Sequence, residues 1–559
     1  MKTFKKLAVI AMSAVFLFTG CGGDVITTNS NRVNALSEED AKAELASLLK
    51  KIPVNEVSDP VMDIYSEETS EADALADIDT FPMVLEGKGD IDIEIAAPSE
   101  LSGNAPDDWL IAVAQKFNKA EYEIDGESVS VSIRKISSGE VVTYVKADAY
   151  HPDMYIPSNY ALGLMLEASG VSITKIEDRI AGNTAGILLK DDIYETVKEK
   201  YGEINVANIL TAANNGDVTF AYTNPYTSAT GLNILTAMLA SFDEKDPLSA
   251  TASQALLDYQ KKAPPVAYTT GVLRNSAKKG IINAMVMEEQ AYINTPELKD
   301  YHYTPAGIRH DHPVYVFDWT GSQKQKAAEM FVKFCKSEPA QKLATEKGFN
   351  LHDDYVSDDP GLTGTQYISA QQLWKENKNG GKPIVAVFVA DVSGSMDGEP
   401  LNSLKDSLVK SSIYIGQEHY IGLVSYSSDV TVNLPIAQFD AAQQAYFSGE
   451  VKGLYANGGT ATYDACLVAM NMIEEKLKEI PDAKPMIFLL TDGEQNEGYS
   501  LNRVTGIIGG LQIPVYTIAY NYGNVEDLEK ISGINEAAAI NADSDDIVNQ
   551  LRNLFNVNM

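Results

Sequence analysis

Short apolar runs alternate with amphipathic stretches over two long parts of the chain. Between residues 91 and 350, runs such as IDIEIAA (91–97) and VYVFDW (314–319) have the length and composition of strands, and apolar residues recur at helical spacing between them. The same alternation starts again at Pro383 and continues to the end of the chain. Strands separated by helices are typical of parallel sheets, so the pattern predicts two α/β units, at 91–350 and 382–559.

The segments outside these two units lack such periodicity. Residues 22–36 are small and polar, whereas EEDAKAELASLLKKI (38–52) has the serine cap and acidic first turn of a helix. We interpret 21–90 as a tether followed by an acidic stalk, with the alternative that the stalk packs on the next domain. The acidic and then glycine-rich stretch 351–381 is typical of a linker, with one helix around QQLWKEN (371–377).

The beginning of the chain has the pattern of an export signal. Lysines precede the apolar run LAVIAMSAVFLF (7–18), which is short for a membrane span, and Thr-Gly-Cys (19–21) follows. This ending resembles a bacterial lipobox, apart from Phe18 in place of the usual leucine. The resemblance implies a signal peptide over 1–20, a lipid on Cys21, and a chain anchored at the cell membrane that faces outside the cytoplasm. An ordinary cleaved signal is the alternative.

The composition narrows the range of partners. The formal net charge is −34, and such an acidic surface repels phosphate backbones, so nucleic-acid binding is disfavoured. Apart from Cys21, the cysteines are Cys335 and Cys466, which lie in apolar helical contexts and are expected to be buried. Their spacing offers neither a disulfide framework nor a zinc motif.

Hydroxyl and carboxylate side chains follow two strands of the C-terminal unit. The apolar run IVAVFVA (384–390) ends at Asp391, which begins DVSGS, and PMIFLLT (485–491) ends at Asp492. A third loop carries Gly-Gly-Thr460 shortly before a predicted helix. The carboxyl ends of strands form the ligand-binding edge of an open parallel sheet. Such oxygen donors suit Mg²⁺, or Mn²⁺, and the lack of histidine and cysteine in these loops argues against zinc or copper.

The motifs DVSGS, GGT and LLTDG, in this order, resemble the metal-ion-dependent adhesion site of von Willebrand factor type A domains. The resemblance covers 383–555 and implies a doubly wound, mostly parallel, Rossmann-like sheet. It assigns five side chains to the metal: Asp391, Ser393, Ser395, Thr460 and Asp492. In that family the hydroxyls coordinate directly and the aspartates act largely through water.

Two points near these motifs stay open. Thr462 is the alternative to Thr460, because both threonines lie in the same GGTAT stretch. Three flanking acids are interpreted as rim charges rather than ligands: Asp397, Glu399 and Glu494. The resemblance further implies that an open metal position binds a carboxylate from an extracellular or envelope protein.

Three strand-to-helix turns of the 91–350 unit carry hydroxyl side chains. Ser99 follows the first strand, Ser158 follows MYIP, and Thr227 and Ser228 precede a helix. Free N–H groups at a helix start, together with such hydroxyls, can hold an anion. Helix capping explains Ser158, Thr227 and Ser228 equally well.

The segments IDIEIAAPSEL, NPYTSATG and AAEMFVKFCKSEPAQKLATEKGF resemble bacterial extracellular solute-binding proteins of the two-lobed, hinged type. The resemblance implies a periplasmic-binding-protein-like fold with a small solute or oxyanion between its lobes. The candidate ligand contacts are the four hydroxyl residues Ser99, Ser158, Thr227 and Ser228. Further cleft candidates, for which a structural role is favoured, are Arg134, Glu289, His312 and Trp319.

No nucleophile–base pair, Walker loop or metallopeptidase helix is visible, so no enzymatic activity is expected. The two resemblances imply a cell-surface lipoprotein that binds a protein partner through a Mg-dependent adhesion site and carries a solute-binding-like module. The alternative is the substrate-binding receptor of a membrane transporter with an accessory von Willebrand factor A domain.

Overall fold

The computed structural model describes most of the chain after residue 35. The described residues are 36–63, 72, 74–262, 264–267, 270–278, 282–492, 495–520, 526–535, 539–542, 551–552 and 554–555. The predicted signal peptide (1–20) and the predicted lipidation site, Cys21, lie outside them. Among the described helices, none is long and apolar enough to cross a membrane.

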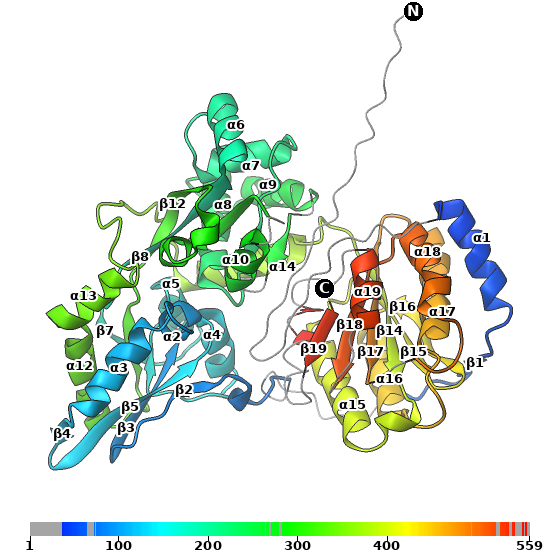
Figure 1. Ribbon diagram of the computed structural model, residues 1–559, viewed down its shortest axis with the longest axis horizontal. Helices are drawn as coiled ribbons and strands as arrows, with labels where there is room; N and C mark the ends of the chain where they lie inside the picture. Colours follow the sequence, from blue (N-terminus) through cyan, green and yellow to red (C-terminus); the bar gives the residue numbers. More distant parts are fainter. Residues whose placement is uncertain are drawn as a thin grey trace, which may run out of the picture.

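The first lobe is a mixed sheet with helices on both faces (Figure 1). Its strand order is β2-β5-β3-β6-β13-β7, with β4 paired to β5. The strands are β2 (Met83–Leu85), β3 (Ile91–Ala97), β4 (Glu123–Ile124), β5 (Glu127–Lys135), β6 (Met154–Tyr155), β7 (Ile173–Glu177) and β13 (Val314–Phe317). The helices are η1 (Ile78–Thr80), α2 (Ser99–Ser102), α3 (Trp109–Lys119), α4 (Ser138–Lys146), α5 (Ala161–Ala168), α12 (Ser322–Cys335) and α13 (Glu338–Glu346). Ile93 and Ile95 of β3 pack with α3 and α12, whereas Ala96 faces the cluster of α4 and α5, as strand alternation requires.

The second lobe is built on an antiparallel sheet of order β11-β8-β12 and the parallel pair β9-β10. The strands are β8 (Asn183–Lys190), β9 (Tyr222–Thr223), β10 (Val266–Ala267), β11 (Ala284–Glu288) and β12 (Tyr301–His310). The helices are α6 (Asp191–Tyr201), α7 (Val206–Asn214), α8 (Ala229–Phe242), α9 (Ala250–Gln260), α10 (Thr270–Lys278), α11 (Glu289–Ile293) and η2 (Pro296–Leu298). Because β12 returns the chain to β13 of the first lobe, the second lobe lies in sequence between two segments of the first lobe.

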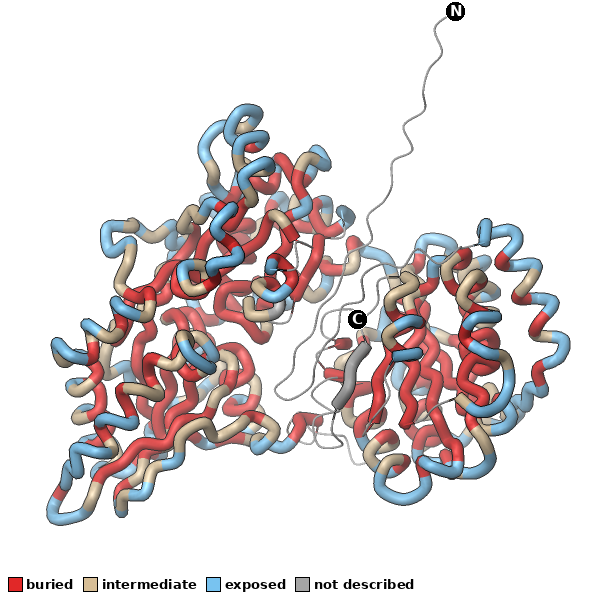
Figure 2. The backbone as a smooth tube through the Cα atoms, viewed as in Figure 1, coloured by how far each residue is buried: buried red, intermediate tan, exposed pale blue. Residues whose placement is uncertain are grey.

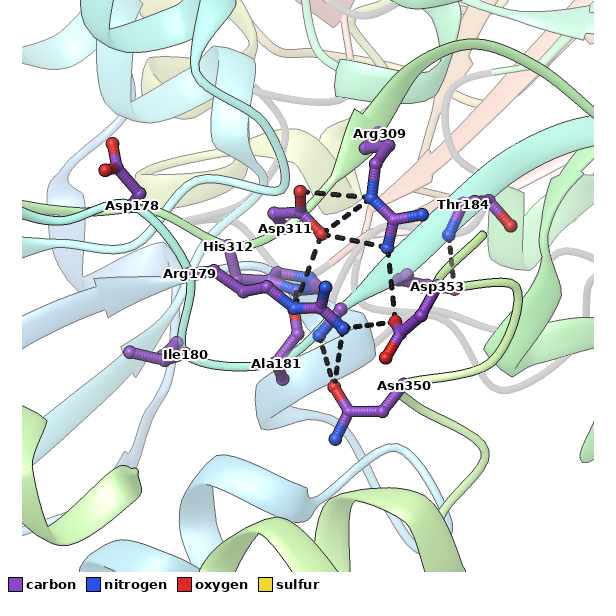
Figure 3. A network of polar contacts seen from close by, with 12 residues as sticks. Asp178, Arg179, Ile180, Ala181, Thr184, Arg309, Asp311, His312, Asn350 and Asp353 are labelled. Carbon is purple, nitrogen blue, oxygen red and sulfur yellow. Dashed lines mark hydrogen bonds and ion pairs between the residues drawn. The ribbon is translucent and has the colours of Figure 1, made fainter. Parts of the chain in front are cut away.

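A polar network lies where the chain passes between the lobes (Figure 3). Asp311, just after β12, accepts two hydrogen bonds of 3.1 Å from Arg309 and lies 3.6 Å from Arg179, which follows β7. Arg179 also contacts Asp353 at 2.5 Å, and Asn350 accepts from Gly182 at 2.7 Å. The crossing segments are thus tied to each other and to the stretch after α13.

The C-terminal sheet has the order β1-β16-β15-β14-β17-β18-β19, and β16 runs antiparallel to β15. The strands are β14 (Ile384–Asp391), β15 (Tyr420–Tyr426), β16 (Val430–Gln438), β17 (Lys484–Thr491), β18 (Val515–Tyr520) and β19 (Ala539–Ala542). The helices are η3 (Gly394–Met396), α15 (Glu399–Ser411), η4 (Ser412–Tyr414), α16 (Ala441–Gly453), α17 (Thr462–Glu479), α18 (Leu501–Leu511) and α19 (Glu526–Ile534). Every residue of β14 is buried (Figure 2). Phe388 packs toward α15 and α16 and Val387 toward α17, which explains why this strand is apolar on both faces.

Part of the predicted stalk belongs to this C-terminal domain, which differs from the expectation for 21–90. The predicted helix forms as α1 (Glu38–Leu49) and packs on α17 and α18, where Ala41, Leu45 and Leu48 are buried (Figure 1). β1 (Val54–Glu56) then pairs in parallel with β16 as an edge strand. The acidic composition hid this docking, because the apolar stripe of α1 is narrow. The two-lobed module therefore lies in sequence between two pieces of one domain.

The segment 351–381, which was predicted to be a linker, packs against the two-lobed module. The helix expected at 371–377 is longer, α14 (Gly364–Asn377), and begins with a capping box at Thr363. It contacts α5 of the first lobe and α8 and α9 of the second. Trp374 is buried and donates through Nε1 to the Tyr222 hydroxyl at 2.8 Å. Near the C-terminus, buried Arg552 forms a 2.5 Å ion pair with Glu140 of α4, so the described residues join the two modules at more than one point.

Candidate metal site and solute cleft

The three predicted metal loops meet at one edge of the C-terminal sheet. β14 and β17 are parallel neighbours, which brings Asp391 and Asp492 to the same edge of the sheet. The Ser393 and Ser395 hydroxyls lie 3.0 Å apart, and Ser395 donates to Asp492 Oδ1 at 2.9 Å. The hydroxyls and one carboxylate therefore form a continuous group of oxygen atoms.

Asp391 is fully buried beneath these hydroxyls. Its Oδ1 accepts from the Ser393 backbone N–H at 2.8 Å, and its Oδ2 accepts from Thr491 at 2.7 Å and from Tyr426 at 3.2 Å. Burial raises the pKa of Asp391, and the nearby charge of Asp492 raises it further. The hydrogen bonds from Thr491 and Ser393 lower this pKa but do not cancel the increase. Asp391 thus holds the loop in shape, and a nearby cation would stabilise its ionised form.

The loop that carries Thr460 is fastened to the other two. The Gly394 N–H donates to the Gly458 carbonyl at 3.1 Å, which brings the GGT segment against DVSGS. The Thr460 N–H donates to Asn496 Oδ1 at 2.9 Å, and the Thr460 carbonyl accepts from the Asn496 N–H at 3.1 Å. Asn496 was not predicted; its only signal in the sequence is its position four residues after Asp492.

The residues present fit a hard divalent cation. Three hydroxyls and two carboxylates are the oxygen donors that Mg²⁺ prefers, and among the described residues no group of three or more His, Cys, Asp or Glu offers a competing metal site. Ser395 is exposed, whereas Asp492 is only 9% exposed, so the group opens to solvent at Ser395. Thr462 lies buried in the first turn of α17, Asp397 and Glu399 are exposed, and Glu494 lies outside the described residues.

A cavity of about 560 Å³ lies between the two lobes. Its first-lobe lining includes Ser99, Glu100, Asp107, Lys135 and Ser137, and its second-lobe lining includes Thr270, Arg274, Lys278, Glu288 and Gln290. Across it, Arg274 contacts Asp107 at 2.8 Å and Gln290 Nε2 donates to Asp107 Oδ1 at 3.0 Å. The lobes therefore close on each other through polar contacts at this cavity.

Of the four predicted hydroxyl contacts, Ser99 lines the cavity and the others make internal contacts. Ser158 is buried and donates to Glu100, whose carboxylate faces the cavity. Ser228 caps α8 by accepting from the Gly231 N–H at 3.3 Å, and buried Thr227 lies directly before it. Capping, the alternative interpretation of these residues, is what the structure has at Ser228.

The further cleft candidates have the structural contacts that were favoured for them. Arg134 is buried and pairs with Glu94 at 2.9 Å, and Glu289 pairs with His352 at 2.9 Å. Trp319 donates to the Pro152 carbonyl at 2.8 Å and is half exposed. His312 Nδ1 is 2.8 Å from the Ala181 carbonyl.

Buried cysteines were predicted correctly at Cys335 and Cys466. The cleft carboxylates Glu100 and Glu288 were not predicted. Glu100 directly follows the predicted contact Ser99, and Glu288 is the last residue of β11, but acidic residues are so common in this chain that such positions do not stand out.

Two family models match the parts of the chain just described. Residues 386–555 match the von Willebrand factor type A domain, and residues 101–350 match the bacterial extracellular solute-binding protein family. The chain therefore combines a solute-binding-protein module with a C-terminal von Willebrand factor type A domain, and the predicted α/β fold class is confirmed. Domains of the latter type typically use a metal ion.

Curated relatives match about a quarter of the chain. The chain is 34% identical over 166 residues to inter-alpha-trypsin inhibitor heavy chain H3 of Bos taurus, and 31% identical over 166 residues to that of Homo sapiens. Each match covers 26% of this chain and 18% of the relative, so the chain spans about a fifth of the relatives' length.

Two solved structures are similar to parts of the chain. Iron-bound HitA from Pseudomonas aeruginosa is 15% identical, with a TM-score of 0.38, over 52% of this chain and 99% of that one. A von Willebrand factor type A structure from Catenulispora acidiphila is 19% identical, with a TM-score of 0.29, over 31% and 42%. The assignment of the two modules rests on the family models and the strand orders.

Proposed function

We propose that the chain is a lipid-anchored protein of the cell surface that binds a protein partner through a metal ion held in the C-terminal domain. The observation that supports this most is the convergence of three side chains at one edge of the sheet, where the Ser395 hydroxyl lies 3.0 Å from the Ser393 hydroxyl and 2.9 Å from Asp492 Oδ1. A bound Mg²⁺ (or Mn²⁺) would supply an electrophilic position for a carboxylate of the partner.

The side chains of the chain itself have separate tasks in this proposal. Ser393, Ser395 and Thr460 would hold the ion through neutral hydroxyls, and Asp391 and Asp492 through water. Because few anionic groups would touch the ion directly, its charge would stay available to the partner's carboxylate. Asp391 also fixes the loop through Thr491 and Tyr426. We propose no enzymatic role, because the described residues of the site offer oxygen donors and no nucleophile–base pair.

The test is capture of proteins from cell-envelope extract by the full chain, with Mg²⁺ or with EDTA. Ser395→Ala removes an exposed hydroxyl of the site without touching the core, and Asp391→Ala removes the buried carboxylate. Asp397→Ala, an exposed acid two residues from Ser395, is the matched control. We expect Mg²⁺-dependent capture in the wild type and the control, and its loss in both site variants. Capture that is equal in EDTA would contradict the proposal.

The anchor is tested separately. Metabolic labelling with palmitate should label the wild type and leave Cys21→Ser unlabelled, and only the wild type should sediment with membranes. Release of both proteins into the soluble fraction would contradict the anchor and leave the metal site untouched.

A second candidate function is that of a substrate-binding receptor for a membrane transporter. The 560 Å³ cavity between the two lobes is the observation that favours it. Solute binding with a decrease in the radius of gyration by small-angle scattering would support this role. Retained solute binding in Asp391→Ala would show that the two modules act independently.

A further inference from the structure

The positive side chains around the interlobe cavity are largely paired with acids of this chain. Arg274 contacts Asp107 at 2.8 Å, and Lys278 contacts Glu297 at 3.0 Å. Lys135 is the third cation of the lining. After these pairs are formed, the carboxylates of Glu100 and Glu288 outnumber Lys135. Glu100 also lies 3.6 Å from Nε2 of buried His312.

Glu100 and Glu288 come from opposite lobes; Glu288 is buried and Glu100 is largely buried. Glu288, the last residue of β11, is 4% exposed, and Glu100 in α2 has a side chain that is 12% exposed. Burial and then the charge of Glu100 raise the pKa of Glu288 to about 7, so the two carboxylates interact. Burial alone would raise the pKa of Glu100 as well, but contacts with His312 and Ser158 hold it below its usual value. One negative charge is therefore firmly present at the cavity, and the second forms readily if a cation arrives.

The side chain of Gln290 independently indicates that a hydrogen-bond donor is missing from the described part of the cavity. Its side chain is fully buried and lines the cavity, and its Nε2 donates to Asp107 Oδ1 at 3.0 Å. Because a carboxylate only accepts, this contact fixes which end of the amide is nitrogen. The remaining Oε1 is buried and has no hydrogen-bond partner among the described residues. A buried acceptor without a donor costs free energy that a donating ligand would recover.

We infer that the cleft binds a small organic solute through a primary ammonium or guanidinium group. Glu100 and Glu288 neutralise the positive charge of this group, and Gln290 Oε1 accepts a hydrogen bond from one of its N–H groups. An oxyanion, one of the solute classes that the family resemblance implies, would meet two carboxylates and an unpaired acceptor beside the single remaining cation of the described lining, Lys135. A metal ion fits less well, because the described residues contain no group of three His, Cys, Asp or Glu that could hold one. This inference concerns the two-lobed module and is independent of the metal-dependent adhesion proposed above.

The experiment uses the full chain and measures binding by calorimetry and by the shift in unfolding temperature. The cationic probes are putrescine, arginine and ethanolamine; choline is the matched cation without N–H donors, and sulfate and molybdate are the oxyanions. We expect at least one primary ammonium or guanidinium probe to bind, ethanolamine to bind more tightly than choline, and neither oxyanion to bind. The comparison of probes needs no variant, so it decides the matter even where a substitution unfolds the protein.

Glu288→Gln and Glu100→Gln test the two carboxylates, and Glu346→Gln, an exposed position on α13, is the matched control. We expect each cleft variant that keeps its circular-dichroism spectrum to weaken cation binding about tenfold or more, because a buried charge-assisted contact is lost, and the control to bind as the wild type does. Binding of sulfate or molybdate, choline as tight as ethanolamine, or no binding by any cationic probe would overturn the inference. None of these outcomes bears on Mg²⁺-dependent capture at Ser395.

Discussion

The metal site and the solute cleft are built in opposite ways. The metal-site side chains stand on loops at one edge of one sheet, where β14 and β17 are hydrogen-bonded neighbours. The cleft takes Glu100 from one lobe and Glu288 from the other, and the chain passes between the lobes through the network around Asp311. A site on one sheet is held by the core below it, whereas a site split between lobes depends on how the lobes are arranged. The two sites should therefore respond to different substitutions.

The largest effect on stability is expected from a substitution that leaves a cavity in the hydrophobic core below the metal loops. Phe388 is fully buried and stacks on Phe488 with ring centroids 5.0 Å apart. Phe388→Ala should lower the free energy of unfolding of the C-terminal domain by about 3–5 kcal/mol, since it leaves a cavity in the central strand. Calorimetric scans of the full chain would measure it. An equal loss in the two-lobed module would show that both modules unfold as one unit and would break the comparison.

The next effect concerns the segment before the two-lobed module. Leu45 of α1 is 3% exposed and belongs to the same core as Ile507 and Ile508. Leu45→Ala should cost the C-terminal domain about 2–4 kcal/mol in urea unfolding, because truncation of a buried leucine leaves a void. Leu36→Ala, at an exposed leucine, is the control and should cost less than about 0.5 kcal/mol. Equal curves for both variants would mean that α1 is a detachable stalk.

The stability of the two-lobed module should depend on pH through the carboxylate of Glu288 in the cleft. Its pKa in the fold is about 7, above the usual 4.5, so folding favours the protonated carboxyl. The stabilisation from this group is complete below about pH 4.5 and is lost as the pH rises to 7, by roughly 2–3 kcal/mol. The difference between wild type and Glu288→Gln in urea unfolding at pH 5 and pH 8 measures it. Parallel pH profiles for the two proteins would rule out this titration.

The smallest effect is expected at the passage between the lobes. Asp311 interacts with Arg309 and Arg179, whose side chains are 14% and 34% exposed, so solvent screens part of each contact. Asp311→Asn should change stability by about 1 kcal/mol or less. Its sharper readout is the affinity for a cleft ligand, which should shift while Mg²⁺-dependent capture stays as in the wild type. A change in capture alone would reverse the assignment of this network to the lobes.

The difference between the one-sheet metal site and the two-lobed cleft also explains how much of each could be predicted from the sequence. β14 is apolar at nearly every position and ends at Asp391. This one local pattern was enough to predict the strand, the edge of the sheet where it ends, and the oxygen donors at that edge. Glu100 and Glu288 are 188 positions apart in an acidic chain, and nothing local shows that they face one cavity. β12 was missed because Pro305 and alternating polar residues weaken its strand pattern. β1 was missed because all three of its residues are exposed.

The docking of α1 and β1 on the C-terminal domain has a mechanical consequence. With the proposed anchor at Cys21, the chain between the lipid and Ser37 can extend over roughly 55 Å at most. A partner held at the metal edge would pull against the membrane through α1, β1 and the sheet of that domain. The two-lobed module, inserted between β1 and β14, would stand outside this path of force. The two-lobed module could therefore open and close on its solute while the bond between the metal site and the partner carries a pulling force.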